Sequence, residues 1–152
     1  MAEYYNKPTA LTKFINSTVR QLASIGLSPR DTVAVRVRGR KSGKMRSNVV
    51  TYVEHDGARY LVAPRGTTEW VRNVRAAGGE ASLKRRRAQA VRLVEVPEEQ
   101  RAPIIRSYLQ KMPALVQREF GVEPDAPDAD IQRIAPRHPV FRIVDAGASQ
   151  GA

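Results

Sequence analysis

The sequence contains no cysteine and only two histidines, His55 and His138. Without thiols the chain has no disulfide framework, no thiol nucleophile and no cysteine-based zinc site, and two imidazoles leave little for a histidine-rich metal site. No apolar run approaches the roughly 20 residues that cross a bilayer, and the N-terminus lacks the apolar region of a signal peptide. We therefore expect a cytoplasmic protein without a bound metal.

Acidic residues are outnumbered as well. Fifteen Asp and Glu stand against 26 Lys and Arg, which gives a formal net charge of +11 on 152 residues. Such an excess indicates an acidic partner, and nucleic acid, an anionic membrane and a small polyanion all satisfy it. Hydrophobic residues at 41% and charged residues at 27% are ordinary for a globular chain. The length predicts a single domain over residues 1–152.

The N-terminal segment, residues 1–30, is expected to form an amphipathic helix followed by a linker. Its apolar residues recur at helical spacing: Leu11, Phe14, Ile15, Val19, Leu22 and Ile25. We interpret this stripe as a cover for the core. A weak peripheral membrane contact through the same face is the alternative, and it would make the cytoplasmic protein membrane-associated.

From residue 32 the apolar period changes to two, which is typical of half-buried strands. The predicted strands cover about 32–38, 47–54, 59–63, 81–84, 88–96 and 140–144. The predicted helices cover 69–77, 97–113 and 114–120, with an exposed loop over 121–130 and a disordered tail over 146–152. Adjacent strands joined by short turns favour an antiparallel sheet. The fold class is therefore α+β, mainly β: about six antiparallel strands in a small barrel or strongly curled sheet, with flanking helices.

The first candidate site lies between the first two predicted strands, from Gly39 to Arg46. Its two glycines let the backbone approach a ligand, and successive amide groups in such a turn form an anion-binding nest. Arg40, Lys41 and Arg46 add positive charge, and Ser42 adds a hydroxyl. The glycine spacing is not that of a Walker loop, and a hairpin follows instead of a helix. The alternative is a basic hairpin tip in solvent.

The second candidate site runs from Pro64 to Asn73, where a strand end leads through a glycine-containing loop into a helix N-terminus. Such an N-terminus favours negative charge. Trp70, the only tryptophan, offers a flat surface for a planar ring; alternatively it anchors the short helix in the core. Together the two sites suit an elongated ligand with a planar head and an anionic tail.

The succession Gly-Arg-Lys-Ser-Gly-x-x-Arg-x-Asn, Ala-Pro-Arg-Gly and Trp-x-Arg-Asn-x-Arg-Ala resembles the deazaflavin-dependent nitroreductase family of actinobacteria. The resemblance is clear over residues 32–96 and looser through 113 and the last strand. It implies a split β-barrel related to flavin-binding reductases. It also implies coenzyme F420, a hydride carrier with a phosphodiester and an oligoglutamate tail, which would account for the basic charge. FMN is the less favoured alternative.

The resemblance also implies site residues. The phosphate and tail would lie against Arg40, Lys41, Ser42, Gly43 and Arg46, with Asn48 also on the coenzyme. The deazaflavin ring would lie along Ala63, Pro64, Arg65, Gly66 and Thr67, with Trp70 and Asn73 bordering the pocket. Trp70 and Tyr108 are the candidate catalytic residues, although the spacing of Tyr108 favours a packed helix face.

The implied reaction is hydride transfer from the reduced deazaflavin to an electron-poor small molecule such as an enone, a quinone or a nitro compound. Family members that reduce nitroimidazoles carry tyrosines where residues 112–120 here have none, which argues against nitroreduction. A basic nucleic-acid-binding domain and a non-catalytic F420 carrier are the alternative functions. We expect no nucleic acid, because the aromatic residues do not interleave with the basic ones. Monomer and dimer both remain open.

The other polar residues suggest no further site. His55 and His138 are expected at exposed positions, and the basic run from Lys84 to Arg87 at a solvated hairpin tip. The acidic residues between 125 and 130 lack calcium-loop spacing and are interpreted as part of a soluble loop. No Ser-His-Asp set is visible in the sequence.

Overall fold

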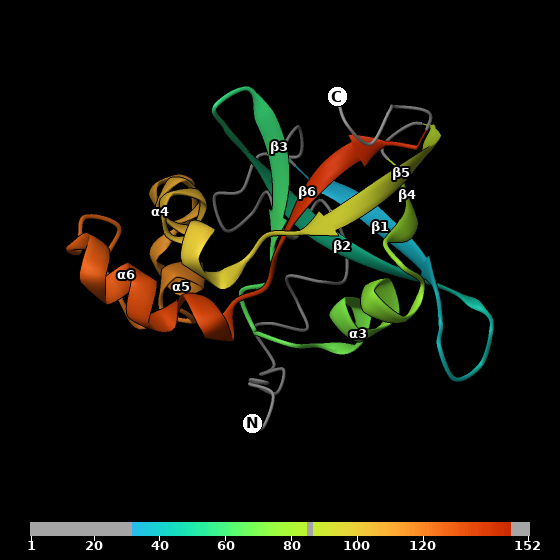
Figure 1. Ribbon diagram of the computed structural model, residues 1–152, viewed down its shortest axis with the longest axis horizontal. Coiled ribbons are helices and arrows are strands. Elements are labelled where there is room, and N and C mark those ends of the chain that lie inside the picture. The colour runs from blue at the N-terminus through green and yellow to red at the C-terminus, as the bar shows by residue number, and fades with distance from the viewer. Residues whose placement is uncertain (1–31, 85–86, 147–152) are drawn as a thin grey trace.

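The computed structural model describes residues 32–84 and 87–146, so the predicted N-terminal helix and the tail after residue 146 lie outside the described residues. Six antiparallel strands of the described chain close into a barrel in the order β1-β2-β3-β6-β5-β4, and β4 pairs with β1 (Figure 1). They are β1 (Thr32–Arg38), β2 (Met45–His55), β3 (Ala58–Val62), β4 (Glu80–Lys84), β5 (Ala88–Glu95) and β6 (Val140–Asp145). The predicted strands and their antiparallel pairing are confirmed.

The first hairpins show why these residues form strands. Val33, Val35 and Val37 of β1 alternate along the chain and are all buried inside the barrel. Asp56 and Gly57 connect β2 to β3 with φ values of 49° and 79°. Positive φ at both central residues is the geometry of a two-residue hairpin turn whose twist matches that of the strands.

The helices lie in two places around the barrel (Figure 1). The helix α3 (Glu69–Ala76) follows β3 and precedes β4 in the sequence. In space it contacts β1. The others gather on another side: η2 (Glu98–Gln100), α4 (Ala102–Lys111), α5 (Ala114–Gln117), α6 (Asp128–Ile134) and η3 (Ala135–Arg137). None of the helices in the described chain is long and apolar enough to span a membrane.

The helix α6 corrects only the end of the predicted exposed loop over residues 121–130: residues 121–127 are outside helices and strands and exposed or half-exposed, but residues 128–130 begin the helix. Pro127 precedes the helix, and Asp128 and Asp130 lie in its first turn, where carboxylates interact favourably with the helix dipole. Ile131 and Ile134 are buried behind them. The proline and aspartates that suggested a loop therefore form a helix start, and the helical period that follows was too short to recognise.

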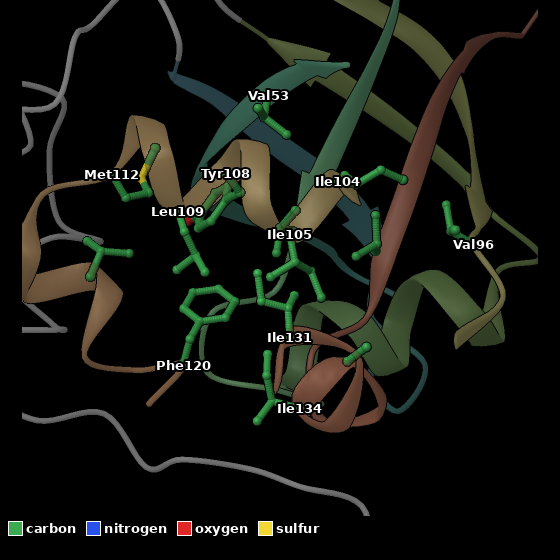
Figure 2. Close-up of a cluster of buried hydrophobic side chains, with 14 residues drawn as sticks. Val53, Val96, Ile104, Ile105, Tyr108, Leu109, Met112, Phe120, Ile131 and Ile134 are labelled. Carbon is green, nitrogen blue, oxygen red and sulfur yellow. The ribbon is translucent and has the colours of Figure 1, made fainter. Parts of the chain in front are cut away.

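Two hydrophobic clusters fill the molecule. The barrel core lies inside the sheet and under α3, and it includes Leu61, Trp70 and Phe141. The helical-side core lies between the helices α4 to α6 and the outer face of the barrel (Figure 2). Its members include Ile105 and Phe120.

Candidate functional site

The loop from Gly39 to Lys44 joins β1 to β2 and is held in a tight turn. The Gly39 amide donates to the Lys44 carbonyl at 2.7 Å, and the Gly43 amide donates to the Gly39 carbonyl at 2.9 Å. Gly43 has a φ of 73°, and a Cβ built on Gly39 would lie 3.0 Å from Ser42 Oγ. Both glycines are therefore required by the turn. The turn directs the basic side chains of the loop outward.

The helix α3 lies across from this loop and fixes Arg40. Asn73 Oδ1 accepts from the Arg40 backbone amide at 3.1 Å and from Arg40 Nη1 at 2.8 Å. Glu69 Oε2 accepts from the same Nη1 at 2.6 Å. One guanidinium edge is therefore occupied by two residues of α3, while the side chain as a whole stays partly exposed. Asn73 is the buried member of this contact.

A groove of about 580 Å³ opens between the loop, the start of β2 and α3. We call it the basic groove. Its lining residues are Gly39, Arg40, Lys41, Ser42, Met45, Arg46, Ser47, Asn48, Glu69 and Asn73. The structure thus brings together six of the predicted binding residues: Arg40, Lys41, Ser42, Arg46, Asn48 and Asn73. These come from a hairpin and a helix that are more than 20 residues apart in the chain.

The electrostatics of the basic groove favour an anion. Three cations, Arg40, Lys41 and Arg46, line it against one carboxylate, Glu69. Hydrogen bonding from Arg40 lowers the pKa of Glu69, so this carboxylate stays ionised. In the described chain no ion pair involves Lys41 or Arg46. The groove therefore keeps two cations available for a ligand while Arg40 is held in place.

The second predicted motif, residues 63–68, is a turn that leads from β3 into α3. The Gly66 amide donates to the Ala63 carbonyl at 3.2 Å, and Gly66 has a φ of 84°. Ala63, Gly66 and Thr67 are buried, and Pro64 and Arg65 are half-buried. None of these five residues lines the basic groove. The structure therefore places this turn outside the basic groove.

Two polar atoms of this turn are buried without a hydrogen-bond partner in the described chain: Arg65 Nη1 and Thr68 Oγ1. Thr68 stands at the N-cap of α3, yet its hydroxyl makes no capping bond. Buried polar groups are paired in most native structures, so each exception needs an explanation. A polar ligand group beside the turn would supply the missing partners.

Trp70 is buried and offers no exposed ring platform, whereas its catalytic role stays a prediction. Its side chain is 5% exposed and lies in the barrel core, 5.8 Å from Phe141 between ring centroids. The apolar period of α3 turns Trp70, Val71 and Val74 toward the sheet. The alternative prediction, a core anchor for the short helix, is confirmed.

Tyr108 likewise does not face an open site, and its catalytic role stays a prediction. It is buried in the helical-side core and lies 5.6 Å from Phe120 between ring centroids. Burial raises the pKa of Tyr108 well above that of a free phenol, so its hydroxyl stays protonated. The packed helix face that its spacing favours is what the structure shows.

His138, predicted at an exposed position, is the most buried polar residue of the described chain at 1% exposure. Its Nδ1 lies 3.0 Å from the Ala63 carbonyl oxygen, although 75 residues separate the two in the chain. Its ring stacks on Phe120 at 4.1 Å. Sequence reasoning missed this residue because only tertiary contacts bury it.

The structure also brings a serine, a histidine and an aspartate together where none was visible in the sequence. Ser107 Oγ lies 3.0 Å from His55 Nδ1, and Asp56 Oδ2 lies 3.5 Å from His55 Nε2. The Asp56 side chain is 90% exposed at the β2–β3 turn. A solvated carboxylate at this distance orients an imidazole weakly, so we assign this group no catalytic role.

The fold and the site define a class: a split β-barrel with an anion-binding groove beside its short helix. A family model of F420H(2)-dependent quinone reductases matches residues 13–127. The chain therefore belongs to this family, and it is an F420-dependent oxidoreductase whose coenzyme is F420. The resemblance noted in the sequence is confirmed, as is the expected coenzyme. No curated protein matches the chain.

Solved structures show the same fold at low identity. One described as a domain-swapped dimer is 24% identical, with a TM-score of 0.51, over 75% of this chain and 80% of that chain. The F420-H2 dependent reductase FDR-A is 23% identical, with a TM-score of 0.50, over 77% of this chain and 96% of that chain. The protein Atu2129 from Agrobacterium tumefaciens, of unknown function, is 13% identical, with a TM-score of 0.52, over 96% and 60%.

Proposed function

We propose that the chain reduces a quinone-type small molecule with reduced coenzyme F420, and that the basic groove binds the anionic tail of the coenzyme. The observation that carries the proposal is the groove itself. Arg40, Lys41 and Arg46 present three cations to a space of about 580 Å³. A phosphodiester followed by carboxylates is the kind of ligand that several cations and a hydroxyl hold together.

The turn at residues 63–68 is our proposed site for the deazaflavin ring. The unpartnered Arg65 Nη1 and Thr68 Oγ1 fit a ligand that offers polar atoms along one edge. When bound, the reduced coenzyme supplies the hydride, and the protein supplies binding, orientation and exclusion of water. Because Ala63 and Thr67 are buried, this turn would contact the ring mainly through its backbone and through Pro64 and Arg65.

Each residue of the basic groove has a defined task in this proposal. Arg40 is fixed by Asn73 and Glu69, so it presents a preorganised cation. Lys41 and Arg46 can adapt to the position of the tail because no ion pair in the described chain restrains them. Ser42 Oγ accepts from the Lys44 amide at 3.2 Å and its hydroxyl hydrogen can donate to a phosphate.

The test begins with binding and proceeds to turnover. Equilibrium dialysis of the protein against F420, FMN and a short DNA duplex at two salt concentrations should show saturable binding of F420 alone. Reduced F420 should then be oxidised in the presence of a benzoquinone, and less readily with an enone or a nitroimidazole. Binding of DNA with steep salt dependence and no binding of F420 would refute the proposal. Binding without turnover would indicate a carrier.

A further inference from the structure

His138 lies in the short connection between the last helical turn and the last strand. It follows η3, and Val140 begins β6 two residues later. At 1% exposure its imidazole is enclosed on all sides. Such burial of a polar ring is costly unless its nitrogen atoms have partners. The partner that the structure gives Nδ1 is the carbonyl oxygen of Ala63, the first residue of the proposed ring site.

The tautomer of His138 follows from this contact. A carbonyl oxygen only accepts, so Nδ1 must carry the hydrogen and donate it. Burial lowers the pKa of His138 to about 4, so at neutral pH the ring is uncharged with its hydrogen on Nδ1. The imidazole therefore acts at this position as a fixed hydrogen-bond donor.

The Ala63 carbonyl accepts the hydrogen bond that closes the turn. It accepts the Gly66 amide at 3.2 Å, while the Ala63 amide donates to the Pro139 carbonyl at 2.9 Å. Further along the turn, the Thr68 amide donates to the Gly66 carbonyl at 2.9 Å. Both backbone groups of Ala63 are thus tied to residues 138 and 139. A carbonyl oxygen has two lone pairs, so it can serve His138 and Gly66 together.

The flat face of the imidazole packs in the helical-side core, while its Nδ1 edge contacts the turn. Its ring stacks on Phe120 with an interplanar angle of 28°, and Phe120 packs on Tyr108 of α4. A phenylalanine at position 138 would serve the stacking without the cost of burying two nitrogen atoms. Phenylalanine could not donate to the Ala63 carbonyl, whereas the imidazole does.

We propose that His138 is a positioning residue for the turn at residues 63–68, and that its bond to Ala63 sets how well the turn accepts a planar ring. The inference rests on the proposed function, in which this turn contacts the deazaflavin. It assigns His138 to the ring and not to the tail, because the basic groove includes none of residues 63–68 and no residue beyond 73.

Two substitutions separate the donor from the ring shape. His138→Phe keeps a ring for Phe120 but removes the donor, whereas His138→Asn places an amide hydrogen near the position of Nδ1. For the folded His138→Phe variant we expect the Kd for F420 to rise about fivefold or more, the effect of one lost hydrogen bond. The Kd for inorganic pyrophosphate, a probe of the basic groove, should stay unchanged. His138→Asn should recover most of the F420 affinity.

Two further measurements do not depend on the coenzyme. Nitrogen-15 NMR of the wild-type protein should show His138 neutral with its hydrogen on Nδ1, and hydrogen exchange at the Gly66 amide should be faster in His138→Phe than in His138→Asn. A wild-type Nε2–H tautomer, or equal F420 affinity and equal Gly66 exchange in both variants, would overturn the inference. Failure of wild-type protein to bind F420 would instead refute the proposed function, with the tautomer and Gly66 exchange still deciding the role of His138.

Discussion

The basic groove and the turn at residues 63–68 present their chemical groups in opposite ways. In the groove the ligand-facing atoms belong to side chains such as Lys41 and Arg46, which extend from an exposed loop. In the turn the side chains of Ala63 and Thr67 are buried, so under our proposal the ring would meet mainly the backbone, Pro64 and Arg65. Ligand binding in the groove therefore depends on charge, whereas the shape of the turn depends on packing. We expect salt to weaken anion binding in the groove. Loss of buried contacts should instead lower the stability of the turn.

The largest effect is expected where α3 leaves the turn, at Trp70. Replacement by alanine in Trp70→Ala would empty a large volume of the barrel core beside Phe141, and such changes cost about 3–5 kcal/mol of unfolding free energy. Urea denaturation followed by circular dichroism measures this loss. Leu115→Ala, at a side chain that is 36% exposed, is the control and should change stability by less than about 0.5 kcal/mol. Equal stability of the two variants would show that Trp70 is no core residue.

The second effect is a pH dependence of stability that His138, beside the turn, should contribute between about pH 4 and pH 6.5. In the unfolded chain His138 takes up a proton near pH 6.5, whereas in the folded protein its pKa is about 4. Between these values the unfolded state binds more protons, so stability rises with pH. The contribution is complete above pH 6.5 and is lost as the pH falls toward 4. It amounts to about 3 kcal/mol for the shift as a whole.

Denaturation of wild-type protein and His138→Phe at several pH values between 4.5 and 7 checks this. The unfolding free energy of the wild type, relative to that of His138→Phe, should rise with pH over this range. The other titratable groups are shared by both proteins, so this change reports on His138. Parallel curves would mean that His138 is already charged in the folded protein or exposed to water.

The sequence predicted the barrel and the groove because both depend on local patterns. Alternation of valines predicts β1, and Asp56-Gly57 predicts the turn after β2. The groove was recognisable because its glycines and cations are consecutive in one hairpin. Glu69 and Asn73 come from the distant helix α3. The motif Trp-x-Arg-Asn indicated Asn73, whereas Glu69 was not predicted.

What the sequence could not predict depends on contacts between distant residues. His138 is buried because Ala63 and Phe120 close around it, and nothing in the neighbouring residues Arg137 and Pro139 indicates this. The loop before α6 is likewise fastened by Arg106, which donates to the Pro124 and Ala126 carbonyls at 2.8 and 2.6 Å. Composition alone describes such a segment as exposed.

The third effect is the loss of ligand affinity when the groove loses charge. We expect Lys41→Ala and Arg46→Ala each to raise the Kd for F420 about tenfold or more at low salt, because each removes a charge-assisted hydrogen bond. The factor should shrink as salt screens the groove. Arg133→Ala on α6 removes the same charge from an exposed pair with Asp130 and is the matched control. If all three variants bound F420 alike, net charge and not the groove would hold the ligand.

The smallest effect concerns Glu69, the one carboxylate in the basic groove. It accepts from Arg40 Nη1 at 2.6 Å and is 66% exposed, so the ion pair itself contributes less than about 1 kcal/mol to stability. Its charge nevertheless opposes any anion that enters the groove. Glu69→Gln keeps an acceptor for Arg40 and removes the charge. We therefore expect the Kd for pyrophosphate to fall about twofold to fivefold, the influence of one charge a few ångströms away in water.

Glu69→Ala separates this repulsion from a positioning role, since it removes both the charge and the acceptor. If repulsion dominates, both variants should bind pyrophosphate more tightly than the wild type, and the gain should disappear at high salt. If Glu69 instead serves to hold Arg40 in place, Glu69→Ala should bind more weakly while Glu69→Gln does not. Isothermal titration at two salt concentrations distinguishes the cases. Asn73 Oδ1 accepts from Arg40 Nη1 at 2.8 Å and from the Arg40 amide at 3.1 Å, and neither substitution removes these acceptor contacts, so repulsion is the outcome that the geometry favours.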